Sequence, residues 1–148
     1  MKRFYIIIPL LVFSADRIIK YFASSINLGG GFVKVGLYKN YAGAFSLPIA
    51  GTVYNILGVF LILIFVYLLI KELRFGNPKK IFAFQIIILG GVSNIFDRLY
   101  FGYVIDYIQI INRSFFNIAD LMLIAGVATL LAKQIKRKTK SEKGKTTA

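Results

Sequence analysis

The chain has 148 residues, of which 57% are hydrophobic, and its mean hydropathy of +0.70 is too high for a water-soluble domain of this size. It contains no cysteine and no histidine, which excludes disulfides, thiol nucleophiles, Ser-His pairs and the common zinc ligands. The net charge of +13 comes from basic residues beside apolar runs, which indicates membrane topology and contact with anionic lipid and argues against nucleic-acid binding. We therefore expect one integral membrane domain over residues 1–148, without a metal or other cofactor.

The first apolar run covers residues 4–22 and begins like a signal peptide, directly after two basic residues. Residues 13–15 supply only one of the two small residues that a cleavage site requires, so an uncleaved membrane span is favoured over a cleaved leader. Asp16 and Lys20 in its second half are four residues apart, in the order that favours an ion pair. A structural pair is favoured here over a direct chemical role.

Hydropathy predicts three more spans, over residues 51–70, 81–97 and 115–132. In the loop between span 4–22 and span 51–70, residues 32–38 alternate as a short half-buried strand does. Residues 103–108 are β-branched and aromatic and are predicted to be extended at the interface. The polybasic tail, 133–148, is predicted to be disordered.

The basic segments define the expected topology. The N-terminus, the loop 71–80 and the tail are all basic, so the positive-inside rule places them in the cytoplasm. The loops 23–50 and 99–114 then lie outside. In this arrangement all four aspartates fall at the outer side of the membrane: Asp16, Asp97, Asp106 and Asp120.

The stretch 90–120 holds three aspartates in sequence that is otherwise largely apolar. An ionised carboxylate is costly in such surroundings, so these acids require a chemical explanation. Two carboxylates brought close together share a proton, and one can then activate water while the other acts as an acid. This is how a peptide bond is hydrolysed without metal, thiol or serine. Spacing alone does not select two acids from Asp97, Asp106 and Asp120.

Two other interpretations remain open on the residues alone. The aspartates could pair with Lys20, Arg98 and Arg113 and only hold the helices of a structural membrane protein together. They could also line a path for protons or cations, as in a carrier or channel. The residues favour an acid-pair hydrolase over either alternative.

Asparagines accompany the acids. Asn94 precedes Asp97 by three residues and Asn117 precedes Asp120 by three, which places each pair on one helical face. Each amide could bind the neighbouring acid or a peptide substrate, and Asn117 is also well placed to cap a helix. In residues 40–46, small side chains surround one Asn and one Phe, which is compatible with a close backbone approach or with a plain turn.

Together these motifs resemble the bacterial lipoprotein signal peptidase family, signal peptidase II, over essentially the whole chain. Five stretches carry the resemblance in order: 16–20 (DRIIK), 40–46 (NYAGAFS), 90–98 (GGVSNIFDR), 104–107 (VIDY) and 116–120 (FNIAD). The resemblance implies that Asp106 and Asp120 are the catalytic acids. It further implies that Asp97 orders the site, that Asn40 and Arg98 hold the substrate backbone, that Asn94 and Asn117 support the acids, and that Asp16 and Lys20 are mainly structural.

The same resemblance implies a fold, a substrate and a location. The fold is an all-α membrane bundle of four transmembrane helices with a small extracytoplasmic β-sheet and a short outer helical segment. The enzyme is an aspartic endopeptidase of the bacterial cytoplasmic (inner) membrane, with its active site at the outer face. It removes the signal peptide of a prolipoprotein just before a cysteine that carries diacylglycerol, and peptide antibiotics are expected to inhibit it.

One position departs from the family pattern. The family more often has Gly two residues after the Asn of the second motif, whereas this chain has Ala42 there and Gly43 next. A contact between Gly43 and the substrate is therefore an expectation that rests on a shifted glycine.

Overall fold

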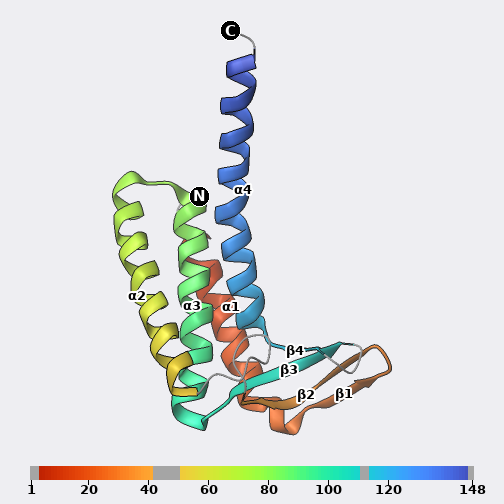
Figure 1. Cartoon of the computed structure of the whole chain (residues 1–148). Helices are drawn as coiled ribbons and strands as arrows, with labels where there is room; N and C mark the ends of the chain where they lie inside the picture. Colours follow the sequence, from red (N-terminus) through yellow and green to blue (C-terminus); the bar gives the residue numbers. More distant parts are fainter. Residues whose placement is uncertain (1–3, 42–50, 111–113, 147–148) are drawn as a thin grey trace.

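The computed structural model describes residues 4–41, 51–110 and 114–146, and in the last helix it describes side chains as far as Ala132. The described residues form four α-helices and one small sheet (Figure 1). The helices are α1 (Phe4–Phe22), α2 (Gly51–Phe75), α3 (Pro78–Phe101) and α4 (Ile118–Thr146), and a 3-10 turn, η1 (Ala23–Ser25), follows α1. The strands are β1 (Asn27–Gly30), β2 (Val33–Asn40), β3 (Val104–Ile110) and β4 (Ser114–Phe116).

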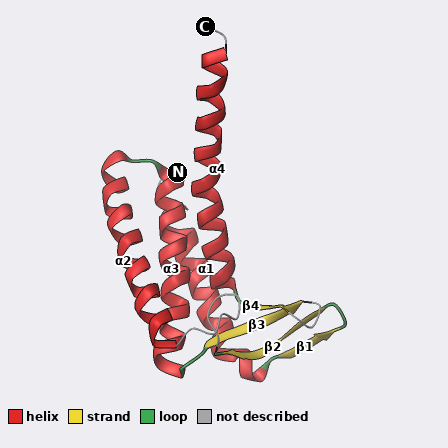
Figure 2. Ribbon diagram, in the orientation of Figure 1, coloured by secondary structure: helices red, strands yellow, loops and turns green. Residues whose placement is uncertain are grey.

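The helices lie side by side in a bundle, and the sheet extends from one end of it (Figures 1 and 2). Helix α3 is central, because α1, α2 and α4 all pack against it. A glycine allows the close approach of α4 to α3. A Cβ atom on Gly90 would lie 2.7 Å from the carbonyl oxygen of Ala119 and 3.1 Å from the Cβ of Met122. The first turns of α4 therefore rest directly on the α3 backbone.

The sheet is antiparallel throughout, in the order β1-β2-β3-β4. Strand β3 is its buried member, and Ile105 and Tyr107 form a small core with Ala23 at the end of α1. The register pairs Tyr38 on β2 with Asp106 on β3. The pairing brings the end of β2, and with it Asn40, beside the start of β3.

The outer faces of the bundle are apolar. An 18-residue window of α2 has a mean hydropathy of 2.7 and no buried residue, and the corresponding window of α3 averages 1.4 and is half buried. These two helices are long and apolar enough to cross a membrane, and α4 contains a shorter apolar stretch, Ile118–Ala132. Large apolar side chains on α1, α2 and α4 are more than half exposed, such as Leu11, Ile56 and Ile124. Continuous apolar exposure of this kind suits lipid and is unfavourable in water.

Helix α1 coincides with the residues predicted for the first span, 4–22, and helices α2, α3 and α4 extend beyond the residues predicted for the other three spans at one or both ends. Helix α2 continues to Phe75, and α3 begins at Pro78 because Asn77 caps it, accepting a hydrogen bond from the backbone N–H of Lys80 at 3.4 Å. It ends at Phe101, and the capping residue Gly102 has a φ of 80°, a left-handed conformation that glycine adopts readily because it has no Cβ atom. The residues predicted for the fourth span begin at 115, where the structure has β4, and α4 begins at Ile118.

The sheet and the tail also differ from the predictions. Strands β2 and β3 confirm the predicted extended segments, but β1 was missed because its sequence is rich in glycine. The described residues hold no short outer helical segment longer than the three residues of η1. The prediction of a disordered tail is wrong for the backbone as far as Thr146, since α4 continues through residues that include many good helix formers.

The close approach at Gly90 generates a first prediction. We expect Gly90→Ala to lower the melting temperature in detergent, because its methyl group meets a backbone carbonyl that cannot move away without shifting α4. The neighbouring Gly91→Ala is the matched control. Its methyl group would meet only the tip of the Ile62 side chain, 3.1 Å away, which can rotate. Equal melting temperatures for the two variants would contradict this account of the contact between α3 and α4.

Candidate active site

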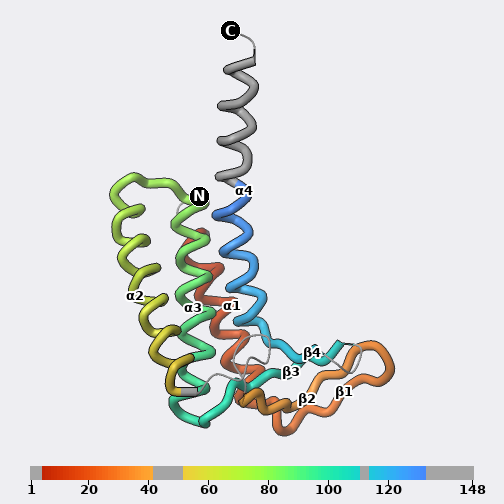
Figure 3. Tube along the Cα trace, in the orientation of Figure 1, coloured from red at the N-terminus to blue at the C-terminus, as the bar shows by residue number. Residues whose placement is uncertain are grey.

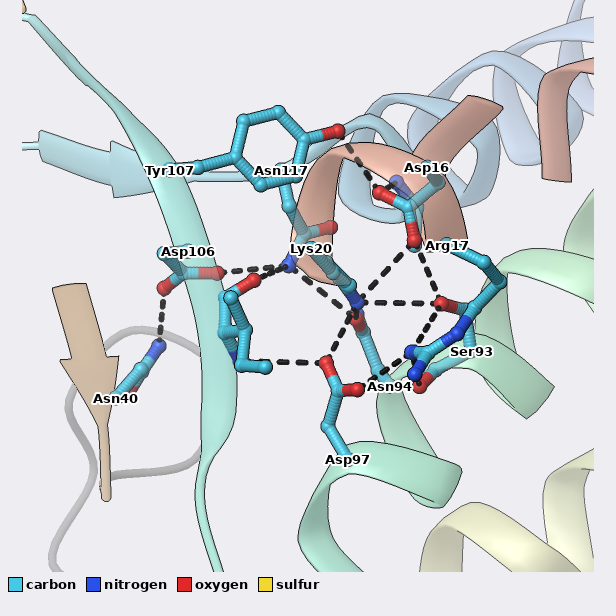
Figure 4. A network of polar contacts seen from close by, with 12 residues as sticks. Asp16, Arg17, Lys20, Asn40, Ser93, Asn94, Asp97, Asp106, Tyr107 and Asn117 are labelled. Carbon is cyan, nitrogen blue, oxygen red and sulfur yellow. Dashed lines mark hydrogen bonds and ion pairs between the residues drawn. The ribbon is translucent and has the colours of Figure 1, made fainter. Parts of the chain in front are cut away.

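A buried ammonium group lies where α1 meets α3 (Figure 4). Lys20 is 2% exposed, and its Nζ lies 3.2 Å from Oδ2 of Asp16 and 2.7 Å from Oδ2 of Asp97. The same Nζ donates to Oγ of Ser93 at 3.2 Å and to Oδ1 of Asn94 at 2.9 Å. The predicted ion pair between Asp16 and Lys20 is confirmed, and it is part of a larger network.

Arg17 supplies the second cation of this network. Its Nη1 contacts Oδ1 of Asp97 at 2.5 Å and also the hydroxyl of Ser93 at 3.3 Å. Asp16 and Asp97 are thus neutralised by Lys20 and Arg17, so two of the four aspartates have a structural ion-pair role. Arg17 and Ser93 were not among the site residues predicted from the sequence. The signal for Ser93 was its spacing, since it lies four residues before Asp97 on the same face of α3.

The ionic network also holds the first turn of α4. Oδ1 of Asp16 accepts hydrogen bonds from the hydroxyl of Tyr107 at 2.9 Å and from the backbone N–H of Ala119 at 3.2 Å. The hydroxyl oxygen of Tyr107 in turn accepts from the N–H of Ile118 at 2.9 Å. Burial, reinforced by the charge of Asp16, raises the pKa of Tyr107 above its usual range, so its hydroxyl keeps its proton and remains a donor.

On its other side, the network positions β3. Oδ2 of Asp97 accepts a hydrogen bond from the backbone N–H of Ile105 at 3.2 Å. Ile105 directly precedes Asp106, so the ion-paired Asp97 fixes the backbone that carries this second acid.

Asp106 and Asp120 are held by amides. Oδ1 of Asp106 accepts from Nδ2 of Asn117 at 2.7 Å, and its Oδ2 accepts from Nδ2 of Asn40 at 2.9 Å. Oδ1 of Asp120 accepts from Nδ2 of Asn94 at 2.7 Å. Asn117 connects the two acids, because it donates to Asp106 and also caps the helix turn that carries Asp120.

The predicted cap at Asn117 is confirmed. Its Oδ1 accepts from the backbone N–H of Asp120 at 2.9 Å, and Oδ2 of Asp120 accepts from the N–H of Asn117 at 3.3 Å. Asn94 behaves differently from the local pattern, because it donates to Asp120 and not to Asp97. Its Oδ1 is occupied by Lys20 and by Nδ2 of Asn117, which directs its own amide group toward Asp120.

The four aspartates therefore divide into two classes. Within the described residues, no Lys or Arg lies within ion-pair distance of Asp106 or Asp120. Burial raises the pKa of Asp106 to about 6, the charge of Asp120 reinforces this increase, and hydrogen bonds from Asn40 and Asn117 oppose it. A buried acid pair with no ion-paired cation among the described residues is suited to holding and transferring a proton.

The remaining predicted residues are placed as follows. Arg98 forms no ion pair with the described acids; its guanidinium lies 5.8 Å from the ring centre of Tyr54 and lines a small pocket that also contains Asn40. Gly43, Ala42 and Arg113 lie outside the described residues. No group of three or more carboxylates gathers as a metal site in the part of the chain that the structure describes.

Tyr107 provides a second prediction. We expect Tyr107→Phe to lower the melting temperature in detergent, because it leaves the N–H of Ile118 without its partner and removes a donor from Asp16. A buried donor left unsatisfied costs about 1–3 kcal/mol. Tyr38→Phe is the control, since among the described residues its hydroxyl binds only Gln109, at 3.0 Å. A decrease in melting temperature no larger than that of the control would mean that Tyr107 does not anchor α4.

Comparisons with known proteins agree with this arrangement. A family model described as "Signal peptidase (SPase) II" matches residues 8–136. The chain is 35% identical to the lipoprotein signal peptidase of Caldicellulosiruptor bescii, across 85% of this chain and 87% of that protein. It is 30% identical to the lipoprotein signal peptidase of Francisella tularensis subsp. novicida, across 93% and 94% of the two chains.

A solved structure described as a bacterial membrane enzyme has the same fold. It superposes with a TM-score of 0.78 at 24% sequence identity and covers 92% of this chain and 90% of its own. The family match over most of the chain, together with the full-length relatives, shows that this chain belongs to the signal peptidase II family.

Proposed function

We propose that this protein removes signal peptides from prolipoproteins and that Asp106 and Asp120 are its catalytic acids. The activity follows from membership of the signal peptidase II family, whose members are aspartic peptidases. The assignment of the acids rests on one observation. Asp16 and Asp97 are neutralised by Lys20 and Arg17, whereas the described residues offer Asp106 and Asp120 only amide and backbone donors.

The chemistry needs one ionised and one protonated acid. The ionised carboxylate takes a proton from water, whose oxygen attacks the carbonyl carbon of the scissile peptide bond. The protonated acid donates to the carbonyl oxygen and stabilises the charge that develops there. Proton transfer to the amide nitrogen then allows the C–N bond to break. The raised pKa of Asp106 supports proton sharing near neutral pH, and the pair titrates as a unit.

The supporting residues have distinct proposed roles. Asp97, Asp16 and Lys20 form the buried ionic scaffold, and Asn94 and Asn117 orient the two acids through their amides. Asn40 and Arg98 line one pocket beside Asp106, which suits contact with the substrate backbone. Gly43 is proposed as a further contact by family resemblance only.

The proposed location is a bacterial cytoplasmic membrane. Helices α1 to α4 would all span it, with cytoplasmic N- and C-termini and the sheet at the outer face. The bundle supports this topology, since α1 begins, and the coloured part of α4 in Figure 3 ends, away from the sheet, and the sheet end carries the four aspartates. A signal peptide held in the same membrane would present its cleavage point, just before a diacylglyceryl cysteine, at this depth.

A carrier or channel is not favoured by the position of the polar groups. The buried acids gather at one end of the bundle, and at the other end the described residues hold the pair of Glu72 and Lys80. Between them the described parts of α2 and α3 carry no ionisable groups other than tyrosine. A path for protons or cations would need polar groups along the span.

Peptide antibiotics that inhibit the family are proposed to occupy the pocket beside Asp106.

The third prediction tests the acids. We expect Asp106→Asn and Asp120→Asn each to reduce cleavage of a diacylglyceryl-modified prolipoprotein below detection, because proton transfer alone contributes about 10²–10⁴-fold. The measurement is the mass loss of the substrate in detergent, with melting temperature as the test of folding. Glu72→Gln, at the opposite end of the bundle, should cleave normally. A well-folded Asn variant that retains native cleavage would remove that aspartate from the mechanism.

The fourth prediction concerns pH. We expect Asn40→Ala to move one limb of the pH profile of kcat/KM to higher pH. The variant removes a hydrogen bond that stabilises ionised Asp106, so the pKa of Asp106 rises further. A shift of either limb to higher pH shows that Asp106 takes part in the ionisation that controls cleavage, because the apparent pKa values belong to the pair. Asn27→Ala, an exposed asparagine on β1, is the control, and a shift to lower pH would be incompatible with the geometry.

A further inference from the structure

A buried oxygen in α2 takes no part in the networks described above. Oδ1 of Asn55 is buried and has no hydrogen-bond partner among the described residues. Leaving a buried polar atom unsatisfied costs about 1–3 kcal/mol, so such atoms call for an explanation. Within the described residues, one other side-chain oxygen shares this condition, Oε1 of Gln85 in α3.

Asn55 differs from Gln85 in its surroundings. It lines a pocket of about 30 Å³ together with Asn40, Tyr54, Arg98, Gly102 and Tyr103, whereas Gln85 does not line this pocket. Asn40 connects the pocket to the acid pair, because its Nδ2 donates to Oδ2 of Asp106 at 2.9 Å. The unsatisfied oxygen is therefore in the compartment next to the candidate catalytic acid.

The pocket offers complementary hydrogen-bonding groups. Arg98 has only donors and forms no ion pair with the described acids, and Oδ1 of Asn55 is only an acceptor. A peptide group presents one carbonyl acceptor and one N–H donor. The small volume suits a main-chain peptide unit better than a bulky side chain. Gly102, with a φ of 80°, adds no side chain to the space.

We infer that Asn55 is a substrate-binding residue, which accepts a hydrogen bond from a backbone N–H of the prolipoprotein near its scissile bond. Arg98 donates to a carbonyl of the same segment, so the two side chains hold the peptide beside Asp106. This inference rests on the proposed function. An ordered water can satisfy Asn55 in the free enzyme, and the substrate N–H then replaces it.

The experiment combines Asn55→Ala with ester-containing substrates. In each substrate one backbone N–H near the cleavage site is replaced by oxygen, and both KM for cleavage and Kd for binding are measured. We expect Asn55→Ala to raise KM and Kd about 2- to 10-fold, as for one hydrogen bond, with little change in kcat. One ester substrate should bind native enzyme and Asn55→Ala equally weakly, because neither complex can form the hydrogen bond between the substrate N–H and Asn55.

The matched control is Gln85→Ala, which removes the other unsatisfied oxygen outside the pocket. It should leave KM, Kd and the response to every ester substrate unchanged. Asn55→Ala should also melt no more than slightly below the native chain, because its oxygen has no partner to lose. If Asn55→Ala behaves like Gln85→Ala in all substrates, the inference is wrong.

The two measurements separate this inference from the proposed function. If the native chain cleaves the substrate, but no ester substitution removes the effect of Asn55→Ala on binding, only the inference is overturned. Binding with coupling but without cleavage supports the role of Asn55 and overturns the proposed function. Absence of both binding and cleavage overturns both.

Discussion

The arrangement of the site depends on the buried ammonium group of Lys20. It lies between Asp16 on its own helix and Asp97 on α3, and Arg17 balances the second negative charge. Removing one partner of a buried ion pair costs about 3–5 kcal/mol, since the remaining charge is left without water or counter-charge. Through Asp97 this pair holds the start of β3, and through Asp16 it holds the start of α4. The elements that carry Asp106 and Asp120 therefore share one anchor.

Two amides transmit this anchorage to the acid pair. Lys20 occupies the oxygen of Asn94, and the amide nitrogen of Asn94 is consequently directed at Asp120. Asn117 caps α4 with its oxygen and donates to Asp106 with its nitrogen. An amide can orient a carboxylate without neutralising it, whereas a lysine would lower its pKa and remove its capacity to hold a proton. The division between ion-paired and amide-bound aspartates is thus the basis for the proposed separation of structural and catalytic roles.

The same division explains how a strongly apolar chain accommodates four acids. They are gathered at the sheet end of the bundle, where β3 covers them and the backbone N–H groups of Ile105 and Ala119 contribute hydrogen bonds. The outer faces of α2 and α4 remain apolar and suited to lipid. A signal peptide is itself an apolar helix-forming segment, so in the proposed topology the site would meet its substrate without drawing it out of the membrane.

Local pattern alone determined the membrane class, the bounds of α1, strands β2 and β3 and the cap at Asn117, because hydropathy and capping act within a few residues. It could not find β1, since Gly29 and Gly30 become a strand only by pairing with β2. From the residues alone, Asp97, Asp106 and Asp120 were equivalent, and family resemblance was needed to choose between them. Tertiary structure separated them: Arg17 and Asp97 are 80 positions apart in the chain and meet only in the folded bundle. Which buried acid gains a counter-charge is decided by such distant contacts and therefore by the fold.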